Sequence, residues 1–233
     1  MAERTGAIVV GAGGGRRMGG VEKAFLSVGG RPLIAHSVSV FHSFAEVDEV
    51  CLVVSEQSVE RARRLARELG WTKVSAVVAG GAERQDSVRA GLDALHACEW
   101  VLVHDAARPL VTPDLVRRGL AAAQRCGAAV AATPVRDTLK RASAAAELPE
   151  VLENVDRTAL WAAQTPQVFR AHILREAFET LGAAAGALTD DGAVVQAAGN
   201  RVFLFEGDSA NLKVTVPGDV AIVEALLSAR SAS

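Results

Sequence analysis

Short apolar runs alternate along this chain with longer amphipathic stretches, and this alternation constrains the fold more than any other feature. The apolar runs cover residues 7–10, 50–54, 74–78, 100–103 and 128–132. Short runs that are apolar on both faces are typical of strands in a parallel sheet covered by helices. Helical spacing of apolar positions marks the stretches between them, at residues 33–44, 58–69, 87–95 and 114–126. The sequence therefore predicts an α/β fold with a doubly wound, mostly parallel, Rossmann-like sheet.

Residues 138–157 interrupt this alternation. Two segments of extended character, at residues 138–141 and 151–155, flank a loop rich in alanine, serine and proline, which predicts a β-hairpin arm. Such a hairpin has too little apolar surface to be stable alone, so we expect it to pack on a partner such as a second subunit. We expect one domain over residues 1–233, the arm included. The pattern after the arm predicts helices at 171–181 and 189–198, a strand at 202–205 and a closing helix from Pro217.

The composition narrows the class of protein. Half of the 233 residues are hydrophobic, 22% are charged and the net charge is −2, so we expect a soluble protein without a broad nucleic-acid-binding face. Cys51, Cys98 and Cys126 lie far apart without a CxxC motif, which predicts neither a zinc site nor a disulfide framework. No apolar run approaches the roughly 20 residues of a membrane span, and no signal-peptide core precedes the first glycines. We therefore expect a cytoplasmic protein that does not bind membranes.

A glycine-rich loop carrying basic residues follows the first predicted strand, from Gly11 to Lys23. Glycines let backbone N–H groups approach phosphate oxygens, and α/β folds bind ligands at the carboxyl edge of the sheet. A dinucleotide fingerprint would need glycine where Arg16 stands, and a Walker A motif would need Gly-Lys-Ser/Thr, which is absent here. The two arginines and the lysine instead favour a triphosphate, whose charge several cations would neutralise.

Further polar loops follow the other predicted strands. Residues 80–88 follow the third, with Asp86 or Ser87 as the expected helix cap, and residues 104–109 follow the fourth. An aspartate at a strand end, such as Asp105, can hold Mg²⁺ or a ribose hydroxyl. Each loop alone would also fit an ordinary surface turn, but together they predict a basic pocket. Four more segments add a cation or a hydroxyl where strand patterns end, at residues 134–141, 156–157, 164–167 and 211–215.

Several of these segments, in their order and spacing, resemble the motifs of the 2-C-methyl-D-erythritol 4-phosphate cytidylyltransferase family. Three departures stand out: Val10 and Gly11 replace a usual Pro-Ala, Glu22 replaces a proline before Lys23, and Ala82 replaces a common acidic residue. Residues 17–23 are closer to molybdenum-cofactor guanylyltransferases, which lack the arm and the motif at 104–109. The resembling segments are residues 13–18, 83–88, 104–109, 134–138, 161–167 and 213–215.

The resemblance implies that 2-C-methyl-D-erythritol 4-phosphate attacks the α-phosphorus of CTP and that pyrophosphate leaves. It implies that Arg17 and Lys23 are catalytic, that Mg²⁺ is held mainly by the triphosphate with Asp105 as a candidate further ligand, and that a homodimer forms by exchange of the arm. The implied CTP-binding residues are Ala12, Gly13, Gly81, Ser87 and Ala106. The implied residues that position the methylerythritol phosphate are Asp105, Arg108, Thr138, Arg157, Thr165 and Lys213.

The lack of an apparent catalytic base or covalent nucleophile in the sequence agrees with this chemistry. A phosphate monoester has a second pKa near ~6 and is largely dianionic at neutral pH, so it needs no general base. No Ser/His/Asp or Cys/His arrangement is apparent, and the histidines in helical patterns receive no role. Two alternatives remain open: a pentitol-phosphate cytidylyltransferase that uses ribitol 5-phosphate, and a non-catalytic nucleotide sensor on the same fold. The retention of Arg17 and Lys23 argues against the sensor.

Overall fold

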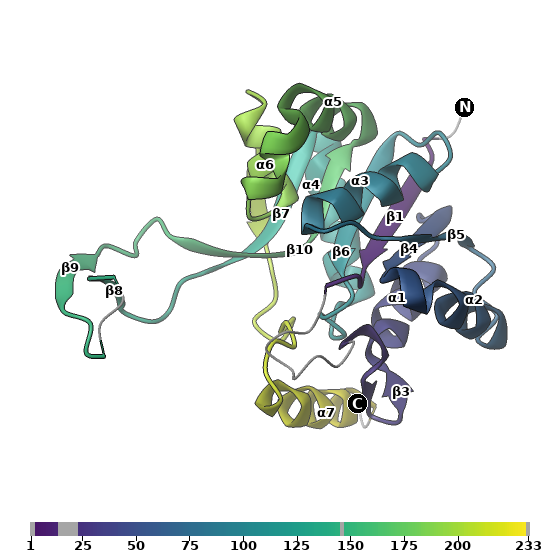
Figure 1. Cartoon of the computed structure of the whole chain (residues 1–233), viewed down its shortest axis with the longest axis horizontal. Coiled ribbons are helices and arrows are strands. Elements are labelled where there is room, and N and C mark those ends of the chain that lie inside the picture. Colours follow the sequence, from purple (N-terminus) through teal and green to yellow (C-terminus); the bar gives the residue numbers. More distant parts are fainter. Residues whose placement is uncertain (1–2, 14–22, 145–146, 232–233) are drawn as a thin grey trace.

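A seven-stranded sheet forms the centre of the molecule in the computed structural model, which describes residues 3–13, 23–144 and 147–231 (Figure 1). The strand order is β11-β7-β10-β6-β1-β4-β5. Neighbouring strands run parallel except at β10, which is antiparallel to both β6 and β7. The predicted α/β class with a mostly parallel sheet is thus confirmed. The strands are β1 (Thr5–Val10), β4 (Glu49–Val54), β5 (Val74–Ala79), β6 (Trp100–Asp105), β7 (Ala128–Pro134), β10 (Trp161–Arg170) and β11 (Phe203–Glu206).

Helices cover both faces of the sheet because successive strand residues point to opposite sides. In β1, Val9 packs in a cluster with α1 (Leu33–Ser43), α2 (Val59–Glu68) and α4 (Pro113–Cys126). Ile8 packs in a second cluster on the other side. The helices of that second cluster are α3 (Arg84–Ala94), α5 (Ala171–Leu181) and α6 (Asp191–Ala197). Strands β1, β4 and β6 are therefore buried on both faces, as the sequence predicted for strands of such a sheet.

Shorter elements complete the fold. The C-terminal helix α7 (Gly218–Ser231) packs through Val223 against Val28 and Leu33, in a small third cluster beside a two-stranded hairpin. The remaining short elements are β2 (Ser27–Val28), β3 (Arg31–Pro32) and the 3-10 turns η2 (Lys23–Phe25), η3 (Glu56–Ser58) and η4 (Gly182–Ala187).

Two helices begin with side-chain hydrogen bonds to backbone N–H groups. Thr112 caps α4, since its hydroxyl accepts a hydrogen bond from the Leu115 N–H at 3.2 Å. The prediction for α3 was wrong. This helix begins at Arg84, so Asp86 and Ser87 lie within its first turns. The Asp86 carboxylate instead accepts from the backbone N–H of Glu83 at 3.1 Å, which satisfies a donor just before the helix.

The predicted arm is present as a hairpin that projects from the body of the molecule (Figure 1). It consists of β8 (Leu139–Ala142) and β9 (Val151–Val155), paired antiparallel. Three of its apolar side chains, Leu148, Val151 and Leu152, are exposed within this chain, and Leu148 is 88% exposed. The described part of the arm therefore gains little from hydrophobic burial in a single chain.

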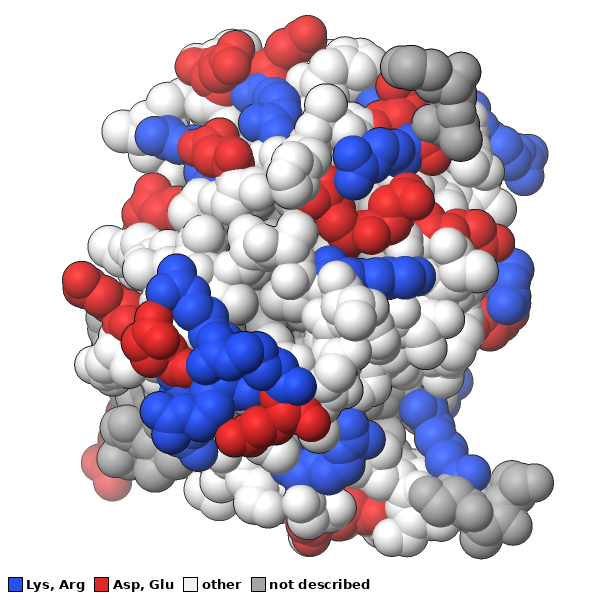
Figure 2. Space-filling model, turned by 90° about the vertical axis from the view of Figure 1, so that its right-hand side faces the viewer, with Lys and Arg blue, Asp and Glu red and all other residues white. Residues whose placement is uncertain are grey.

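The surface carries charges of both signs. Figure 2 shows lysine and arginine side chains next to aspartate and glutamate side chains on the face at the right of Figure 1. Among the described residues, no helix has the length and apolar character needed to cross a bilayer.

Candidate active site

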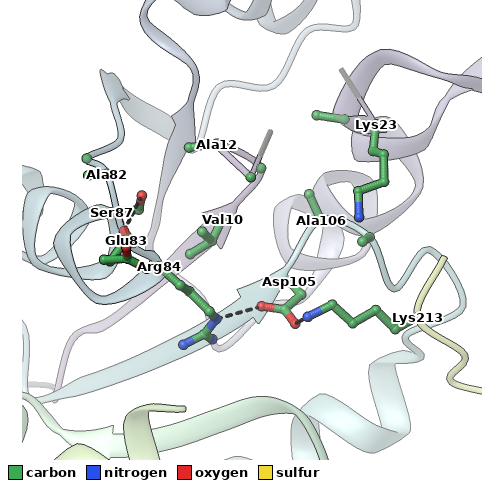
Figure 3. A pocket seen from close by; sticks show the side chains of 15 residues that line it. Val10, Ala12, Lys23, Ala82, Glu83, Arg84, Ser87, Asp105, Ala106 and Lys213 are labelled. Carbon is green, nitrogen blue, oxygen red and sulfur yellow. Dashed lines mark hydrogen bonds and ion pairs between the residues drawn. The ribbon is translucent and has the colours of Figure 1, made fainter. Parts of the chain in front are cut away.

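The loops that follow β1, β5 and β6 meet at the carboxyl edge of the sheet and enclose a cavity of about 260 Å³ (Figure 3). We call this the first cavity. Backbone hydrogen bonds continue the strand pairing into its wall, from Gly11 N–H to the Val53 carbonyl and from Ala106 N–H to the Val10 carbonyl. Its described lining residues are Val10, Gly11, Ala12, Gly13, Lys23, Ala24, Gly81, Ala82, Glu83, Arg84, Ser87, Asp105, Ala106, Ala107 and Lys213.

Two glycines allow the loop after β5 to lie close to its neighbours. A Cβ atom on Gly80 would lie 2.4 Å from the Ala12 Cβ and 2.5 Å from the Ser87 Oγ. A Cβ atom on Gly81 would lie 2.3 Å from the Asp86 Cβ. Real Cβ atoms do not approach other atoms this closely, so a larger residue at either position would displace the loop or these neighbouring side chains.

A row of alternating charges crosses the floor of the first cavity. The Arg84 Nε lies 3.0 Å from one carboxylate oxygen of Asp105, and the Lys213 amine lies 2.7 Å from the other (Figure 3). On its far side, the Arg84 guanidinium lies 2.9 Å from the carboxylate of Asp191, a fully buried residue. We call Asp191, Arg84, Asp105 and Lys213 the charge row.

The charge row sets the protonation state of Asp105. Burial alone would raise the pKa of this carboxyl, but Arg84 and Lys213, with Arg108 close by, hold the pKa well below its ordinary range. Asp105 therefore remains an anion at every physiological pH. It orients two cations at the cavity edge and has no capacity to act as a general acid there.

A second cavity, of about 230 Å³, lies beside the first. Arg84, Asp105 and Lys213 line both cavities, so three members of the charge row form their common wall. The second cavity is otherwise lined by Arg108, Ala163, Gln164, Thr165, Gln167, Thr189 and Asp190. Two adjacent cavities with a cationic wall between them suit a reaction that brings two anionic substrates together.

Comparison with known proteins decides the family. The family model for IspD, 2-C-methyl-D-erythritol 4-phosphate cytidylyltransferase, matches residues 5–229. The chain belongs to this family. The resemblance seen in the sequence motifs is thereby confirmed.

Individual IspD relatives span nearly the whole chain. A 2-C-methyl-D-erythritol 4-phosphate cytidylyltransferase from Dehalococcoides mccartyi strain CBDB1 is 44% identical over 227 residues, covering 97% of this chain and 96% of the relative. The crystal structure of the Thermus thermophilus enzyme of the same name is 37% identical, with a TM-score of 0.79 over 95% of this chain and 98% of that one. A "Bifunctional enzyme IspD/IspF" from Anaeromyxobacter sp. strain Fw109-5 is 45% identical, covering 97% of this chain but 58% of the relative.

The structure brings most of the predicted site residues together. Thr165 and Arg108 line the second cavity, and Lys213 and Asp105 line both. Arg108 is partly engaged, because its guanidinium donates to the Asn211 carbonyl at 2.8 Å. The predicted residues that line the first cavity are Ala12, Gly13, Lys23, Gly81, Ser87, Asp105, Ala106 and Lys213.

Two predicted residues are not brought to the cavities. Thr138 and Arg157 are exposed at the base of the arm, and neither is among the residues that line the two cavities. The Arg157 guanidinium donates to the Arg136 carbonyl instead. The predicted catalytic residue Arg17 lies outside the described residues.

Arg84 and Thr189 belong to the site but were not predicted from the sequence. Arg84 was visible inside the motif at residues 83–88, but only the fold shows that it links Asp105 to Asp191. Thr189 lines the second cavity and stood in the sequence only as the start of a predicted helix. No spacing rule connects either residue with the loop after β6, because long chain segments separate them.

The described residues offer little to a metal ion. Among them, no three histidine, cysteine, aspartate or glutamate side chains come together as a metal-binding group. The described carboxylates that line the first cavity belong to Glu83 and Asp105, and both oxygens of Asp105 already face cations. This donor set does not fit a magnesium site built by the protein alone, since Mg²⁺ needs about six oxygen ligands in octahedral geometry.

Proposed function

We propose that the chain transfers the cytidylyl group of CTP to 2-C-methyl-D-erythritol 4-phosphate, releasing pyrophosphate and 4-diphosphocytidyl-2-C-methyl-D-erythritol. This is a step in isoprenoid precursor synthesis. The observation that carries the proposal is the pair of adjacent cavities with the shared wall of Arg84, Asp105 and Lys213, in a chain of the IspD family.

In the proposed reaction, a phosphate oxygen of the acceptor attacks the α-phosphorus of CTP. A bond forms between that oxygen and the phosphorus, and the bond to the β-phosphate oxygen breaks, so the electron pair leaves with pyrophosphate. Because the acceptor phosphate is already a dianion near neutral pH, no side chain has to remove a proton. The barrier is the repulsion between two polyanions.

Cations would offset this repulsion. At ~4 Å and an effective dielectric of ~20, one pair of unit charges interacts by about 4 kcal/mol. Lys23 extends its amine toward Ala106 in the first cavity (Figure 3), where we place the triphosphate. We propose that Lys23 and Arg17 stabilise the charge that builds on the α-phosphate, and that rate enhancement comes from electrostatics and positioning.

The charge row would receive the acceptor. The Lys213 side chain is 39% exposed, and its amine pairs with Asp105 in the wall that the two cavities share. We propose that Lys213 and Arg108 bind the acceptor phosphate and that Asp105 lies between the acceptor and the ribose. Ala12, Gly13, Gly81, Ser87 and Ala106 would hold CTP, in part through backbone groups.

We propose that Mg²⁺ arrives with the nucleotide and is held mainly by the triphosphate oxygens. Asp105 would join its ligands only by releasing Arg84 or Lys213. Bound there, the ion would neutralise part of the phosphate charge.

We also propose that the protein is a homodimer in which each arm completes the site of the other chain. Thr138 and Arg157 line neither cavity of their own chain, and the arm leaves Leu148 and Leu152 exposed. We propose that residues 1–233 act as one nucleotidyltransferase domain with this arm. A cytoplasmic location is supported by the three cysteines, which are all unpaired.

The test is a pyrophosphate-release assay that crosses CTP, GTP, ATP and UTP with 2-C-methyl-D-erythritol 4-phosphate and ribitol 5-phosphate, with and without Mg²⁺. We expect release only with CTP, the methylerythritol phosphate and a divalent ion. Pyrophosphate release with ribitol 5-phosphate but not with the methylerythritol phosphate would favour a pentitol-phosphate cytidylyltransferase instead. CTP binding without any turnover would favour a nucleotide sensor.

A further inference from the structure

A fully buried histidine is hydrogen-bonded to residues that line the second cavity. His104 is the residue before Asp105 in β6, is 0% exposed, and packs against the Phe41 ring at 5.2 Å between ring centroids. Both of its ring nitrogens have polar partners. Nε2 lies 3.1 Å from the Arg108 carbonyl oxygen, and Nδ1 lies 3.0 Å from the Thr165 Oγ1.

These partners fix where the proton of a neutral His104 ring lies. A carbonyl oxygen only accepts hydrogen bonds, so Nε2 must carry the proton and donate it to Arg108. Nδ1 is then an acceptor, and the Thr165 hydroxyl must donate to it. The same hydroxyl oxygen accepts the backbone N–H of Asp105 at 3.1 Å. Each of these three hydrogen bonds therefore has one defined donor and one defined acceptor.

The surroundings favour the neutral ring. Burial lowers the pKa of His104 to about 4, with Arg108 and Arg84 adding to the effect while the Arg108 carbonyl and Asp105 oppose it. Near neutral pH the imidazolium form, which would turn the Thr165 hydroxyl away, is thus disfavoured.

We propose that His104 is a positioning residue whose Nε2–H tautomer fixes the Thr165 hydroxyl and, through it, the backbone of Asp105 and Arg108. This deepens the proposed function, on which it rests for the identity of the substrates. It also changes the role implied for Thr165 by the family resemblance. The Thr165 proton is committed to His104, so Thr165 does not donate to the acceptor phosphate; it fixes the residues that bind the acceptor.

The proton assignment can be tested on the ligand-free protein without any assay of activity. Long-range ¹H–¹⁵N correlation spectra of histidine-labelled protein distinguish the two tautomers and the imidazolium. The signal of His104 is assigned by its shift in Thr165→Val and by elimination of the more exposed His36, His42, His96 and His172. We expect the Nε2–H tautomer from about pH 8 to about pH 6. An Nδ1–H tautomer or an imidazolium near neutral pH would overturn the proposal.

The positioning role is tested with Thr165→Val, which removes the hydroxyl at nearly constant volume, and Thr165→Ser, which keeps it. We expect Thr165→Val to lower kcat/KM for the acceptor about tenfold, the scale of one lost buried hydrogen bond, with KM for CTP changed less than about twofold. Thr165→Ser should restore most of the loss. Equal loss in both variants, or an unchanged kcat/KM in folded Thr165→Val, would contradict the role.

A double-mutant cycle separates positioning from general damage. Because His104 and Thr165 share one hydrogen bond, adding Thr165→Val to His104→Asn should cost less than it costs in the parent, so the two losses in kcat/KM should not multiply. Fully multiplicative losses would show that the residues act independently and would reject the proposal. If the methylerythritol phosphate proves to be the wrong substrate, the tautomer result still stands, so the two failures are distinguishable.

Discussion

The carboxyl edge of the sheet and the projecting arm both carry cation–carboxylate pairs, but in opposite environments. At the sheet edge, Asp191 is fully buried and the side chain of Asp105 is 9% exposed. In the arm, Arg141 and Glu153 are paired at 2.8 Å with side chains 65% and 54% exposed. A buried pair is costly to break because one charge is left without water, whereas an exposed pair contributes little.

This difference has a functional consequence. The sheet edge positions its charged side chains within one chain, by ion pairs and buried hydrogen bonds around Asp105. The arm presents Thr138 and Arg157 from a hairpin that buries little of its own surface. Residues of the edge are therefore placed by the fold, while residues of the arm would be placed by a second copy.

The largest effect is expected at the sheet edge, from Lys23→Ala. Loss of a charge contact that forms in the transition state should lower kcat by at least about 10² while the circular dichroism spectrum stays unchanged. Arg64→Ala, on the exposed surface of α2, is the control and should leave kcat unaffected. A raised KM with a normal kcat would show that Lys23 contributes only uniform binding.

A buried member of the charge row should affect both stability and activity. Asp191→Asn leaves Arg84 with one anionic partner, so we expect a loss of about 3 kcal/mol in the free energy of unfolding and a lower kcat/KM for the acceptor. Glu49→Gln is the matched control, because Glu49 is also buried and paired but begins β4 at the opposite edge of the sheet. It should lose stability at unchanged kcat/KM. Equal losses of kcat/KM in Asp191→Asn and Glu49→Gln would show that the charge row has no special role in the reaction.

The free energy of unfolding should also depend on pH through His104, by an amount similar to the loss expected for Asp191→Asn. Its pKa is about 4 in the folded chain and ~6.5 when unfolded, so the unfolded state binds more protons between these values. The free energy of unfolding should therefore fall as the pH drops from about 6.5 to about 4, by about 3 kcal/mol from this residue. Urea unfolding of the parent and His104→Asn at about pH 7 and about pH 5 measures it. If the free energy of unfolding falls equally in the parent and in His104→Asn between these pH values, the low pKa of His104 is contradicted. His172→Gln, at an exposed histidine, is the control and should behave like the parent.

The smallest effect is expected in the arm. Arg141→Ala removes the exposed pair with Glu153 and should change the free energy of unfolding by less than about 0.5 kcal/mol. Urea titration at low and high salt measures this change. A loss of several kcal/mol would mean that the arm is stabilised by ion pairs in the same way as the sheet edge.

The sequence predicted the helices and strands that a local pattern of apolar residues is enough to specify. The buried parallel strands, the helices between them and the arm all followed from apolar spacing. Strand β10 was missed because its first seven residues, from Trp161 to Gln167, lack an apolar alternation; only its pairing with β6 and β7 makes it a strand. Arg84 was likewise hidden, since its partners Asp105 and Asp191 lie far away in the chain.

The contrast between sheet edge and arm is tested most directly with mixed dimers. Lys23→Ala and Arg157→Ala, each with a different tag, are co-expressed, and the species carrying both tags is purified. If each arm serves the other chain, one site of a mixed dimer carries both lesions and the other carries neither. We predict that pyrophosphate release recovers to about half of the parent activity, while each variant alone is nearly inactive. Verified mixed dimers that remain inactive would show that Arg157 serves its own chain, and the account of the arm would be wrong.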